Sequence, residues 1–394
     1  MRVCVIVDTA ADSLGLERYA RELLARLIES DLVEEVVIAH SAGWTQPMRL
    51  RINEKQSHKA RELIIPIPNS PFRKELRQLF IAPFLLNKLS REGIDIVHDL
   101  FNFAPFLLSY GRYKKVVTVH DIRSFLSRNM YPTGQRLGFY IRYKYILPLI
   151  LARADSIIAI SNNTKQDLCR HLGVRANKIR VVYHGIDDSY KPIEDPVRLN
   201  KVKSDYKLNY PFILGISTWG CMDNVRSLIE SFKLLRKNIV NDSLNLGDMK
   251  LVFFGYFEPR TVSWVKEIGL GNDIVFLGYI PESDLAPLYS LATLFVYPSL
   301  YEGFGFPPLE AMACGTPTIV SDVSSLPEVV GDGALKVDPY DSVKLAKEIE
   351  SILSNKEAAR HLSLKGRERA AKFTWGETAS ETLKIYSDFL GKRR

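Results

Sequence analysis

The chain has 394 residues, of which 46% are hydrophobic and 25% charged, and its formal net charge is +8. This composition is typical of a globular protein and excludes collagen-like and intrinsically disordered chains, while the longest apolar runs, such as Ile146 to Ala152, are too short to span a membrane. Because the length exceeds what one hydrophobic core usually organises, we expect two domains of somewhat under 200 residues each.

Short runs rich in Val and Ile alternate with helix-length amphipathic stretches throughout the first half of the chain. This alternation predicts an α/β fold in which helices cover parallel sheets. Helices are expected at Leu16 to Glu29 and Asn163 to Leu172. Strands are expected at Arg2 to Val7, Val36 to His40, Leu63 to Pro66, Ile94 to His98, Val116 to His120, Ser156 to Ile160 and Ile179 to Tyr183.

The alternation stops in a polar stretch that contains Pro192 and Pro196 and is followed by Pro211. We therefore expect a first domain at residues 1–190, a linker at 191–210 and a second domain at 211–372. Two doubly wound Rossmann-like domains facing each other would form a ligand-binding cleft. Strands of the second domain are expected at Phe212 to Ser217, Lys250 to Gly255, Ile274 to Gly278, Leu294 to Pro298, Thr318 to Ser321 and Leu335 to Asp338.

The segment SLYEGFGFPPLEAMACGTP, residues 299–317, follows one of these strands. Gly303 and Gly305 allow the backbone of the loop to approach a ligand closely, because glycine has no Cβ. Pro307 and Pro308 suit the first turn of a helix that ends near Gly315. The N-terminus of such a helix favours phosphate.

Glu302 and Glu310 bracket this loop and helix start. A carboxylate accepts hydrogen bonds from neighbouring sugar hydroxyls, so one glutamate could hold a ribose and the other a transferred sugar. The alternative is that Glu310 only stabilises the positive end of the helix dipole.

The two glutamates have the spacing of the Glu, seven residues, Glu motif of retaining glycosyltransferases of family 4, whose GT-B fold has two Rossmann-like domains. EGFGFPPLEAMACGTP and SSLPEVVGDGAL, within residues 302–335, resemble most the bacterial and archaeal mannosyltransferase-like members. GLERYARELL, VVTVHD, SIIAISNNTKQDL and IRVVYHGID resemble parts of the family's N-terminal domain. FTWGETASETLKIY resembles the terminal helix that crosses back onto that domain, here within residues 373–394.

The resemblance implies a retaining hexosyltransferase that uses a nucleotide diphosphate sugar, with a mannose-like sugar favoured. Glu302 would be catalytic and lie beside the transferred sugar, and Glu310 would hold the ribose. The resemblance also implies that backbone N–H groups between the two glutamates bind the sugar hydroxyls and the diphosphate. These residues are Gly303, Phe304, Gly305 and Phe306.

On the first domain, His120 would be the second catalytic residue and contact the sugar, while Gly15 would let a loop approach the phosphate. The backbone near Tyr279 and Ile280, in the second domain, would meet the base. Each has a structural alternative: His120 could be a hydrogen-bonded structural histidine, Gly15 an ordinary turn glycine, and Tyr279 a packing residue.

The loop GISTWGCMDNVRSL, residues 215–228, departs from the family pattern. Asn224 is present, but Asp223 stands where family members have a phosphate-binding Lys, and a carboxylate there repels a diphosphate. Three interpretations follow. Arg226 could replace the missing cation, or the helix N-terminus and a first-domain cation could suffice without it. In the third interpretation the protein is a non-catalytic sugar-nucleotide binder or assembly partner.

No Asp-any-Asp motif occurs, so we expect no metal and no other cofactor. The four cysteines lack the spacings of zinc sites, and the N-terminus lacks the features of a signal peptide, which predicts a cytoplasmic protein.

The positive charge is concentrated in residues 1–200, which carry 30 Lys and Arg against 21 Asp and Glu, whereas residues 201–394 carry 23 against 24. An anionic partner is therefore expected, unless the charges form an ordinary solvated surface. No nucleic-acid motif accompanies them. Basic residues surround LFIAPFLL, residues 79–86, and interleave with aromatic residues at 136–145, which favours a glycan or lipid-linked acceptor and peripheral contact with the inner face of an anionic membrane. The alternative for Leu79 to Leu86 is a core helix. The basic residues are Arg73, Lys74, Arg77, Lys88, Arg91, Arg136, Arg142 and Lys144.

Overall fold

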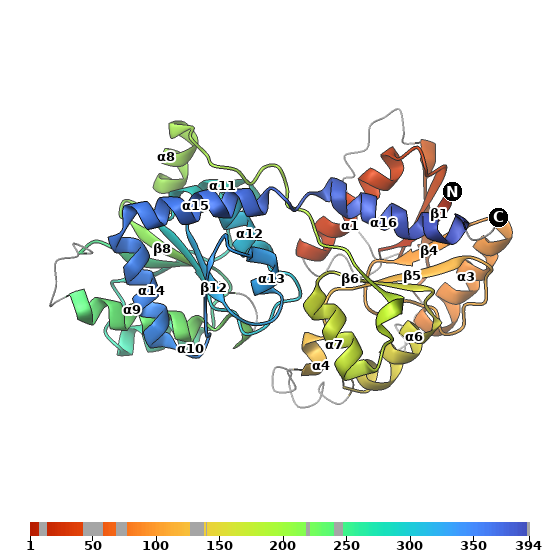
Figure 1. Ribbon diagram of the computed structural model, residues 1–394, viewed down its shortest axis with the longest axis horizontal. Coiled ribbons are helices and arrows are strands. Elements are labelled where there is room, and N and C mark those ends of the chain that lie inside the picture. Colours follow the sequence, from red (N-terminus) through yellow and green to blue (C-terminus); the bar gives the residue numbers. More distant parts are fainter. Residues whose placement is uncertain are drawn as a thin grey trace. The chain divides into compact units, whose positions relative to one another are not determined.

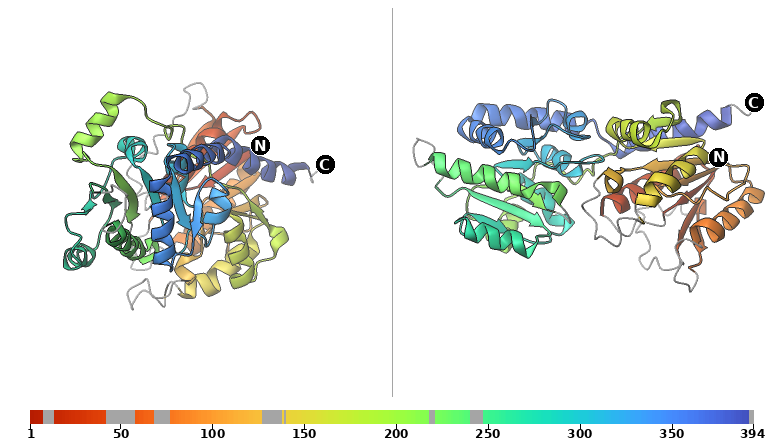
Figure 2. Two further views of the ribbon diagram at one scale, coloured as in Figure 1. Left: turned by 60° about the vertical axis from the view of Figure 1, so that its left-hand side comes forward. Right: turned by 90° about the horizontal axis from the view of Figure 1, so that it is seen from below.

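The computed structural model describes residues 1–7, 14–41, 58–67, 77–126, 138, 140–217, 221–239 and 247–391. The chain divides into two compact units (Figures 1 and 2). The first comprises Met1–Gly185 and Thr374–Arg394, and the second Ile186–Phe373. Among the described helices, none is long and apolar enough to cross a bilayer.

The first unit contains a seven-stranded sheet in the order β3-β2-β1-β4-β5-β6-β7, in which every neighbouring pair is parallel. The inner strands β1, β2, β4, β5 and β6 are mostly buried, as expected for a parallel sheet with helices on both faces, whereas the edge strands β3 and β7 are partly exposed. The strands are β1 (Arg2–Ile6), β2 (Glu35–Ser41), β3 (Ala60–Ile65), β4 (Ile96–Asp99), β5 (Lys114–Val119), β6 (Ser156–Ala159) and β7 (Ile179–Val181).

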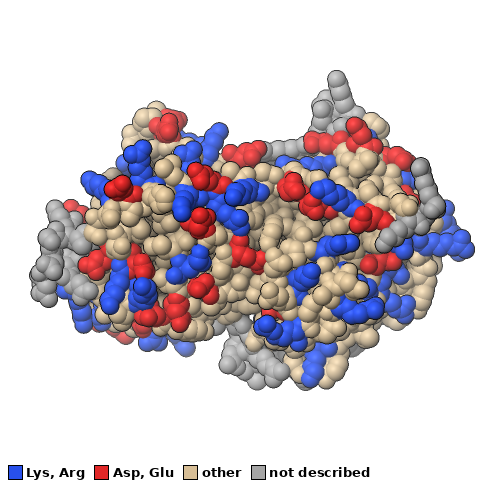
Figure 3. Space-filling model, in the orientation of Figure 1, with Lys and Arg blue, Asp and Glu red and all other residues tan. Residues whose placement is uncertain are grey.

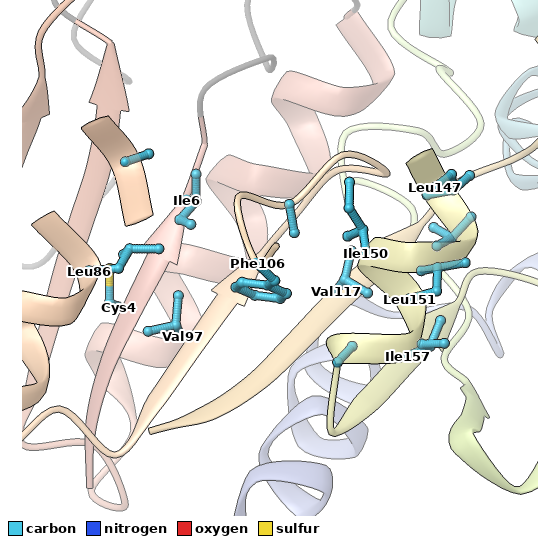
Figure 4. Packing of buried hydrophobic residues seen from close by; sticks show 14 of the residues in the cluster. Cys4, Ile6, Leu86, Val97, Phe106, Val117, Leu147, Ile150, Leu151 and Ile157 are labelled. Carbon is cyan, nitrogen blue, oxygen red and sulfur yellow. The ribbon is translucent and has the colours of Figure 1, made fainter. Parts of the chain in front are cut away.

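Two helices of this unit, α3 and α6, pack on one face of its sheet (Figure 4). Leu86 of α3 packs near Cys4 of β1, and Ile150 of α6 packs near Val117 of β5. The helical elements are α1 (Leu14–Glu29), the π-helical segments η3 (Arg77–Ile81) and η6 (Arg142–Ile146), α3 (Ala82–Leu89), the 3-10 turns η4 (Ser90–Glu92) and η7 (Ala176–Lys178), α4 (Arg123–Leu126), α6 (Leu147–Arg153), α7 (Asn162–Leu172) and α16 (Trp375–Leu390).

The second unit has a six-stranded sheet in the order β10-β9-β8-β11-β12-β13, again with parallel neighbours. The strands are β8 (Phe212–Ser217), β9 (Lys250–Gly255), β10 (Ile274–Phe276), β11 (Leu294–Tyr297), β12 (Thr318–Ser321) and β13 (Leu335–Val337). The helical elements are α8 (Pro196–Asp205), the 3-10 turn η8 (Cys221–Asp223), α9 (Val225–Ile239), α10 (Pro259–Glu267), α11 (Glu282–Leu291), α12 (Phe306–Ala313), α13 (Leu326–Val330), α14 (Ser342–Ser354) and α15 (Lys356–Ala370). The prediction of two Rossmann-like parallel-sheet domains is confirmed.

Residues 191–210, expected to be a linker, belong instead to the second unit and contain α8. The Asp195 side chain accepts a hydrogen bond from Val197 N, and Pro196 occupies the first helical position. Proline starts this helix rather than interrupting the fold, because its fixed φ suits the first turn. Tyr206 and Arg198 then hydrogen-bond to Asp284 and Ser283 at the start of α11.

The chain passes between the units twice, at neighbouring points. Gly185 lies so close to the start of α16 that a Cβ on it would be 2.1 Å from Trp375 N. Ile186 N–H donates to Phe373 O at 3.0 Å, and Thr378 Oγ1 donates to Tyr183 O at 2.8 Å. The C-terminal helix α16 thereby joins the first unit, where it lies along α1 (Figure 1).

Candidate active site

The β11–α12 connection of the second unit carries both predicted glutamates. Gly305, with φ of 110°, is the N-cap residue of α12, and a Cβ there would lie 2.7 Å from Leu326 Cδ2. Glycine is therefore needed for both the backbone conformation and the space. Pro307 and Pro308 fall in the first turn, as the sequence predicts.

Both the side chain and the backbone of Glu302 are fixed by hydrogen bonds. Its Oε1 accepts hydrogen bonds from Tyr297 Oη at 2.6 Å and from Ser299 Oγ at 2.8 Å. Its N–H donates to Ser324 Oγ at 2.9 Å, while Ser325 Oγ donates to the carbonyls of Glu302 and Phe304. The carboxylate therefore has one oxygen fixed by two hydroxyl groups, in a loop anchored to the β12–α13 connection.

Glu310 lies within α12 and is only 5% exposed. Its Oε2 accepts a hydrogen bond from Tyr289 Oη of α11 at 3.0 Å. Burial and the nearby Glu310 charge raise the pKa of Tyr289 well above its usual value, so its hydroxyl remains a donor at neutral pH. Burial, followed by the same charge, also raises the pKa of Cys314.

The β8–α9 connection is tied to this site through Asn224, which adopts a φ of 52°. Its Nδ2 donates to Pro298 O at 3.1 Å and to Pro339 O at 2.7 Å, and Leu300 N–H donates to Met222 O at 2.7 Å. Asn224 thus joins the carboxyl ends of β8, β11 and β13. Residues 218–220 lie outside the described residues.

Asp223 is buried, and Arg226 contacts side chains of its own unit. Asp223 is 3% exposed, within η8. The guanidinium group of Arg226 contacts Glu230 Oε1 at 2.8 Å and lies 5.2 Å from the centre of the Trp264 ring. In the structure Arg226 therefore extends along α9 towards its next turn rather than back towards the β11–α12 connection.

Tyr279 and Ile280 follow β10. Tyr279 is 73% exposed and Ile280 is buried. Gly255 N–H donates to the carbonyl of Gly278 at 2.7 Å, which joins this segment to the end of β9. The structure therefore brings the second-unit candidates to the carboxyl edge of one sheet.

His120 lies at the corresponding edge of the first unit's sheet, after β5. Its Nε2–H donates to Leu100 O at 2.8 Å, and its backbone N–H donates to Asn102 Oδ1 at 3.0 Å. The ring stacks on Phe101 and contacts the edge of Tyr19, with centroid separations of 5.8 and 5.3 Å. Burial lowers the pKa of His120 to about 4, so the ring is neutral at pH 7.

Gly15 is the second residue of α1 and is half-buried. Tyr19, one turn further along α1, contacts His120, so the structure brings this helix start and His120 to the same edge of the sheet. His184 and Trp375 complete the aromatic cluster. The ring centroid of His184 lies 5.4 Å from that of His120 and 5.7 Å from that of Trp375.

A buried polar network lies beneath His120. His98 Nδ1 hydrogen-bonds to Tyr386 Oη at 2.6 Å, and His98 Nε2 to Thr118 Oγ1 at 2.8 Å. Thr118 Oγ1 also lies 3.0 Å from Tyr19 Oη. Burial, with a smaller contribution from His120, lowers the pKa of His98 to about 3. The network joins β4, β5, α1 and α16.

Sequence reasoning missed several residues that position the candidates. Tyr297 ends β11 and Ser299 follows it, so their nearness to Glu302 in sequence was a usable signal. Tyr289 and Ser324 are more than twenty residues from the groups they bind, and no sequence pattern pairs them. Among the described residues, no group of three or more His, Cys, Asp or Glu side chains is arranged to hold a metal ion.

Comparisons with known proteins identify glycosyltransferases. Residues 14–190 match the family model described as Glycosyltransferase Family 4, and residues 198–369 match that of Glycosyl transferases group 1. The chain is 29% identical over 380 residues to O-antigen chain mannosyltransferase B of Escherichia coli, which covers 94% of this chain and 95% of the relative.

Solved structures show the same fold. A glycosyltransferase of Rickettsia africae aligns with a TM-score of 0.75 at 21% identity, covering 99% of this chain and 98% of its own. An Anabaena protein solved in complex with UDP-glucose aligns with a TM-score of 0.70 at 17% identity, covering 98% of this chain and all of its own.

Proposed function

Because the chain belongs to glycosyltransferase family 4 and has that family's GT-B fold, we propose that it transfers a hexose, with a mannose-like sugar favoured, from a nucleotide diphosphate sugar with retention of configuration. The acceptor is a glycan or a lipid-linked saccharide in the synthesis of a cell-surface polysaccharide. The relative from Escherichia coli is a mannosyltransferase of O-antigen chains, which supports both the sugar and the acceptor class.

The single observation that carries the proposal is the fixed carboxylate of Glu302. Two hydroxyl groups orient its Oε1, and its loop leads directly into α12. A carboxylate held in this way stabilises positive charge that develops on the transferred sugar. The positive end of the α12 dipole stabilises negative charge that grows on the leaving diphosphate.

Glu310 and His120 have complementary roles in this proposal. Glu310, supported by Tyr289, binds the ribose hydroxyls of the sugar donor. His120 binds the transferred sugar as a neutral ring, because its pKa of about 4 leaves it uncharged at pH 7. Since its Nε2–H is bonded to Leu100 O, the atom that accepts a sugar hydroxyl is Nδ1.

The decisive experiment measures transfer from a panel of GDP-, UDP- and ADP-sugars, together with thermal shifts for the same ligands. A ligand that binds only the native state raises the melting temperature. Glu302→Ala should bind the preferred donor but lose transfer, whereas Glu350→Ala on α14 serves as the control. NMR of the product tests retention. Inverted product, or full activity of Glu302→Ala, would refute the mechanism.

We also propose that transfer needs no metal ion, because the sequence contains no Asp-any-Asp motif. Activity should then survive an excess of chelator, and restoration of lost activity by a divalent cation would contradict this.

The alternative, a non-catalytic sugar-nucleotide binder, depended on repulsion by Asp223. That side chain is buried within η8. Binding of a sugar nucleotide by the wild-type protein without any transfer to saccharide acceptors would favour the alternative.

We also propose that the protein works in the cytoplasm, with peripheral contact to an anionic membrane when the acceptor is lipid-linked. The basic first half of the sequence supports this contact.

A further inference from the structure

Two helices of the first unit expose apolar side chains along one stripe each. Along η3 and α3, Phe80 and Phe84 are 57% and 72% exposed and are spaced four residues apart. Along η6 and α6, Ile141, Tyr145 and Leu149 are 41%, 55% and 58% exposed at the same spacing. Side chains four residues apart lie on one side of a helix.

The opposite sides of the same helices form the core. Leu86 and Leu89 of α3 and Leu147 and Ile150 of α6 are at most 2% exposed. The expectation of a core helix at Leu79 to Leu86 therefore describes only its inner side. The exposed stripes do not contribute to the core.

A loop connects the C-terminal ends of the two helices, where the stripes terminate. Asn87 of α3 donates to Leu108 O at 3.4 Å and accepts from Tyr110 N–H at 2.8 Å. The guanidinium group of Arg153, at the end of α6, lies 5.5 Å from the centre of the Tyr110 ring. We call this surface the docking face; its apolar members are Phe80, Phe84, Leu108, Tyr110, Ile141, Tyr145 and Leu149.

Scattered exposed apolar residues are ordinary, but a joined set marks an interaction site. The structure describes sixteen exposed large hydrophobic side chains, and seven of them belong to the docking face. This concentration favours a partner with an apolar component.

The charge of the docking face identifies the partner. Between residues 99 and 155 the sequence has nine Lys or Arg and three acidic residues, Asp99, Asp121 and Asp155, of which Asp155 pairs with Lys114 at 3.2 Å. Each stripe continues into a cation four residues further on, at Lys88 and at Arg153, both exposed. Figure 3 shows Lys and Arg over the part of the first unit where α6 lies, with few Asp or Glu among them. A partner must therefore be anionic as well as apolar.

Resting on the proposed lipid-linked acceptor, we propose that the docking face binds the surface of an anionic lipid bilayer. Phe, Tyr, Ile and Leu side chains enter the boundary between headgroups and acyl chains, while Lys and Arg contact the phosphates. Protein interfaces are depleted of Lys at their centre, which makes a protein partner a poorer match. Aliphatic Ile141 and Leu149 offer nothing on which nucleobases could stack.

The direction of the helices connects this face to the site. In a parallel sheet, a crossing helix begins at the carboxyl edge of the strands and runs back to the other edge. The segments η3 and η6, which begin these two crossings, therefore lie towards the carboxyl edge at which His120 lies. A saccharide attached to a membrane lipid would reach His120 at that edge.

The test is sedimentation of the full chain with vesicles of phosphatidylglycerol and phosphatidylcholine, compared with phosphatidylcholine alone. The wild-type protein should bind the anionic vesicles, and binding should weaken as salt is raised. Lys88→Gln, Lys144→Gln and Arg153→Gln together should weaken partitioning roughly 100-fold, at about fivefold for each cation. Phe80→Ser with Phe84→Ser should also weaken it.

A control variant removes similar groups from the second unit: Tyr340→Ser, Val343→Ser and Lys347→Gln, all exposed on or beside α14. It should bind vesicles as the wild type does. Unchanged melting temperatures would show that all variants fold, as expected for exposed positions.

Equal binding to both kinds of vesicle, or equal losses in the docking-face and control variants, would overturn the proposal. So would binding of duplex DNA, or dimerisation through Phe84, without binding to anionic vesicles. Transfer to a water-soluble acceptor without vesicles tests the proposed function separately. Membrane binding without transfer would refute only that function, and transfer without membrane binding would refute only the docking face.

Discussion

Replacing Tyr297 by Phe tests whether a fixed Glu302 carboxylate drives transfer. The substitution removes one hydroxyl group and leaves a ring that is 3% exposed and stacked on Phe295. The lost O–H···O bond of 2.6 Å is charge-assisted, and such bonds contribute about 1.5–3 kcal/mol. Ser299 still donates to the same oxygen, so we expect the lower value, about 1.5 kcal/mol, which lowers kcat roughly tenfold.

The matched control is Tyr289→Phe, which removes the equivalent hydroxyl group from Glu310. Because the ribose is bound alike in the ground state and the transition state, this variant should raise KM for the sugar donor and leave kcat nearly unchanged. Steady-state kinetics with both substrates varied, alongside melting curves, measures the difference. A Tyr297→Phe enzyme of normal stability whose kcat stays within about twofold of wild type would refute the reasoning.

Three further predictions concern the framework of the site. Tyr386→Phe leaves Nδ1 of buried His98 without its hydrogen-bond partner. The free energy of unfolding, measured in urea, should therefore fall by about 1–3 kcal/mol. An unchanged value would mean that another group replaces the lost bond. Because burial holds the pKa of His98 at about 3, the unfolded chain binds more protons below pH 6.5, so stability should fall as pH falls from about 6.5 towards 3. His98→Gln should flatten this part of the melting-temperature profile, and an unchanged slope would exclude His98 as a source. Gly255→Ala places a Cβ 2.0 Å from Ser217 O and should lower the melting temperature more than Gly278→Ala. Both glycines have a positive φ, 104° at Gly255 and 74° at Gly278, but a Cβ at Gly278 would have no atom within 4 Å. Equal losses would show that the close approach is unimportant.

The strands could be predicted because buried parallel strands are continuous runs of Val, Ile, Leu and Phe between turn residues. Phe212–Ser217, Lys250–Gly255 and Thr318–Ser321 have the expected bounds. Prolines near residue 196 were misleading, since a proline that ends one element can equally begin a helix. The Asp195 cap was the local signal for α8.

The glutamates and the glycine loop of the candidate site were also predictable, because their spacing is local. The partners that fix them were not. Whether Tyr289 reaches Glu310, or Asn224 reaches Pro298 and Pro339, depends on how separate connections meet at the sheet edge. Asp223 shows the same limit: its residue type suggests repulsion of a phosphate, but its burial is set by tertiary packing.

The contacts of Asn224 and Arg226 limit which groups can neutralise the diphosphate of the proposed sugar donor. Asn224 is committed to two carbonyl groups, and Arg226 is paired with Glu230 and Trp264. Of the three interpretations raised by Asp223, replacement of the family's Lys by Arg226 is therefore the least supported by the structure. The α12 dipole supplies about half a positive charge, less than a diphosphate requires. The proposed chemistry consequently needs cations from elsewhere in the chain.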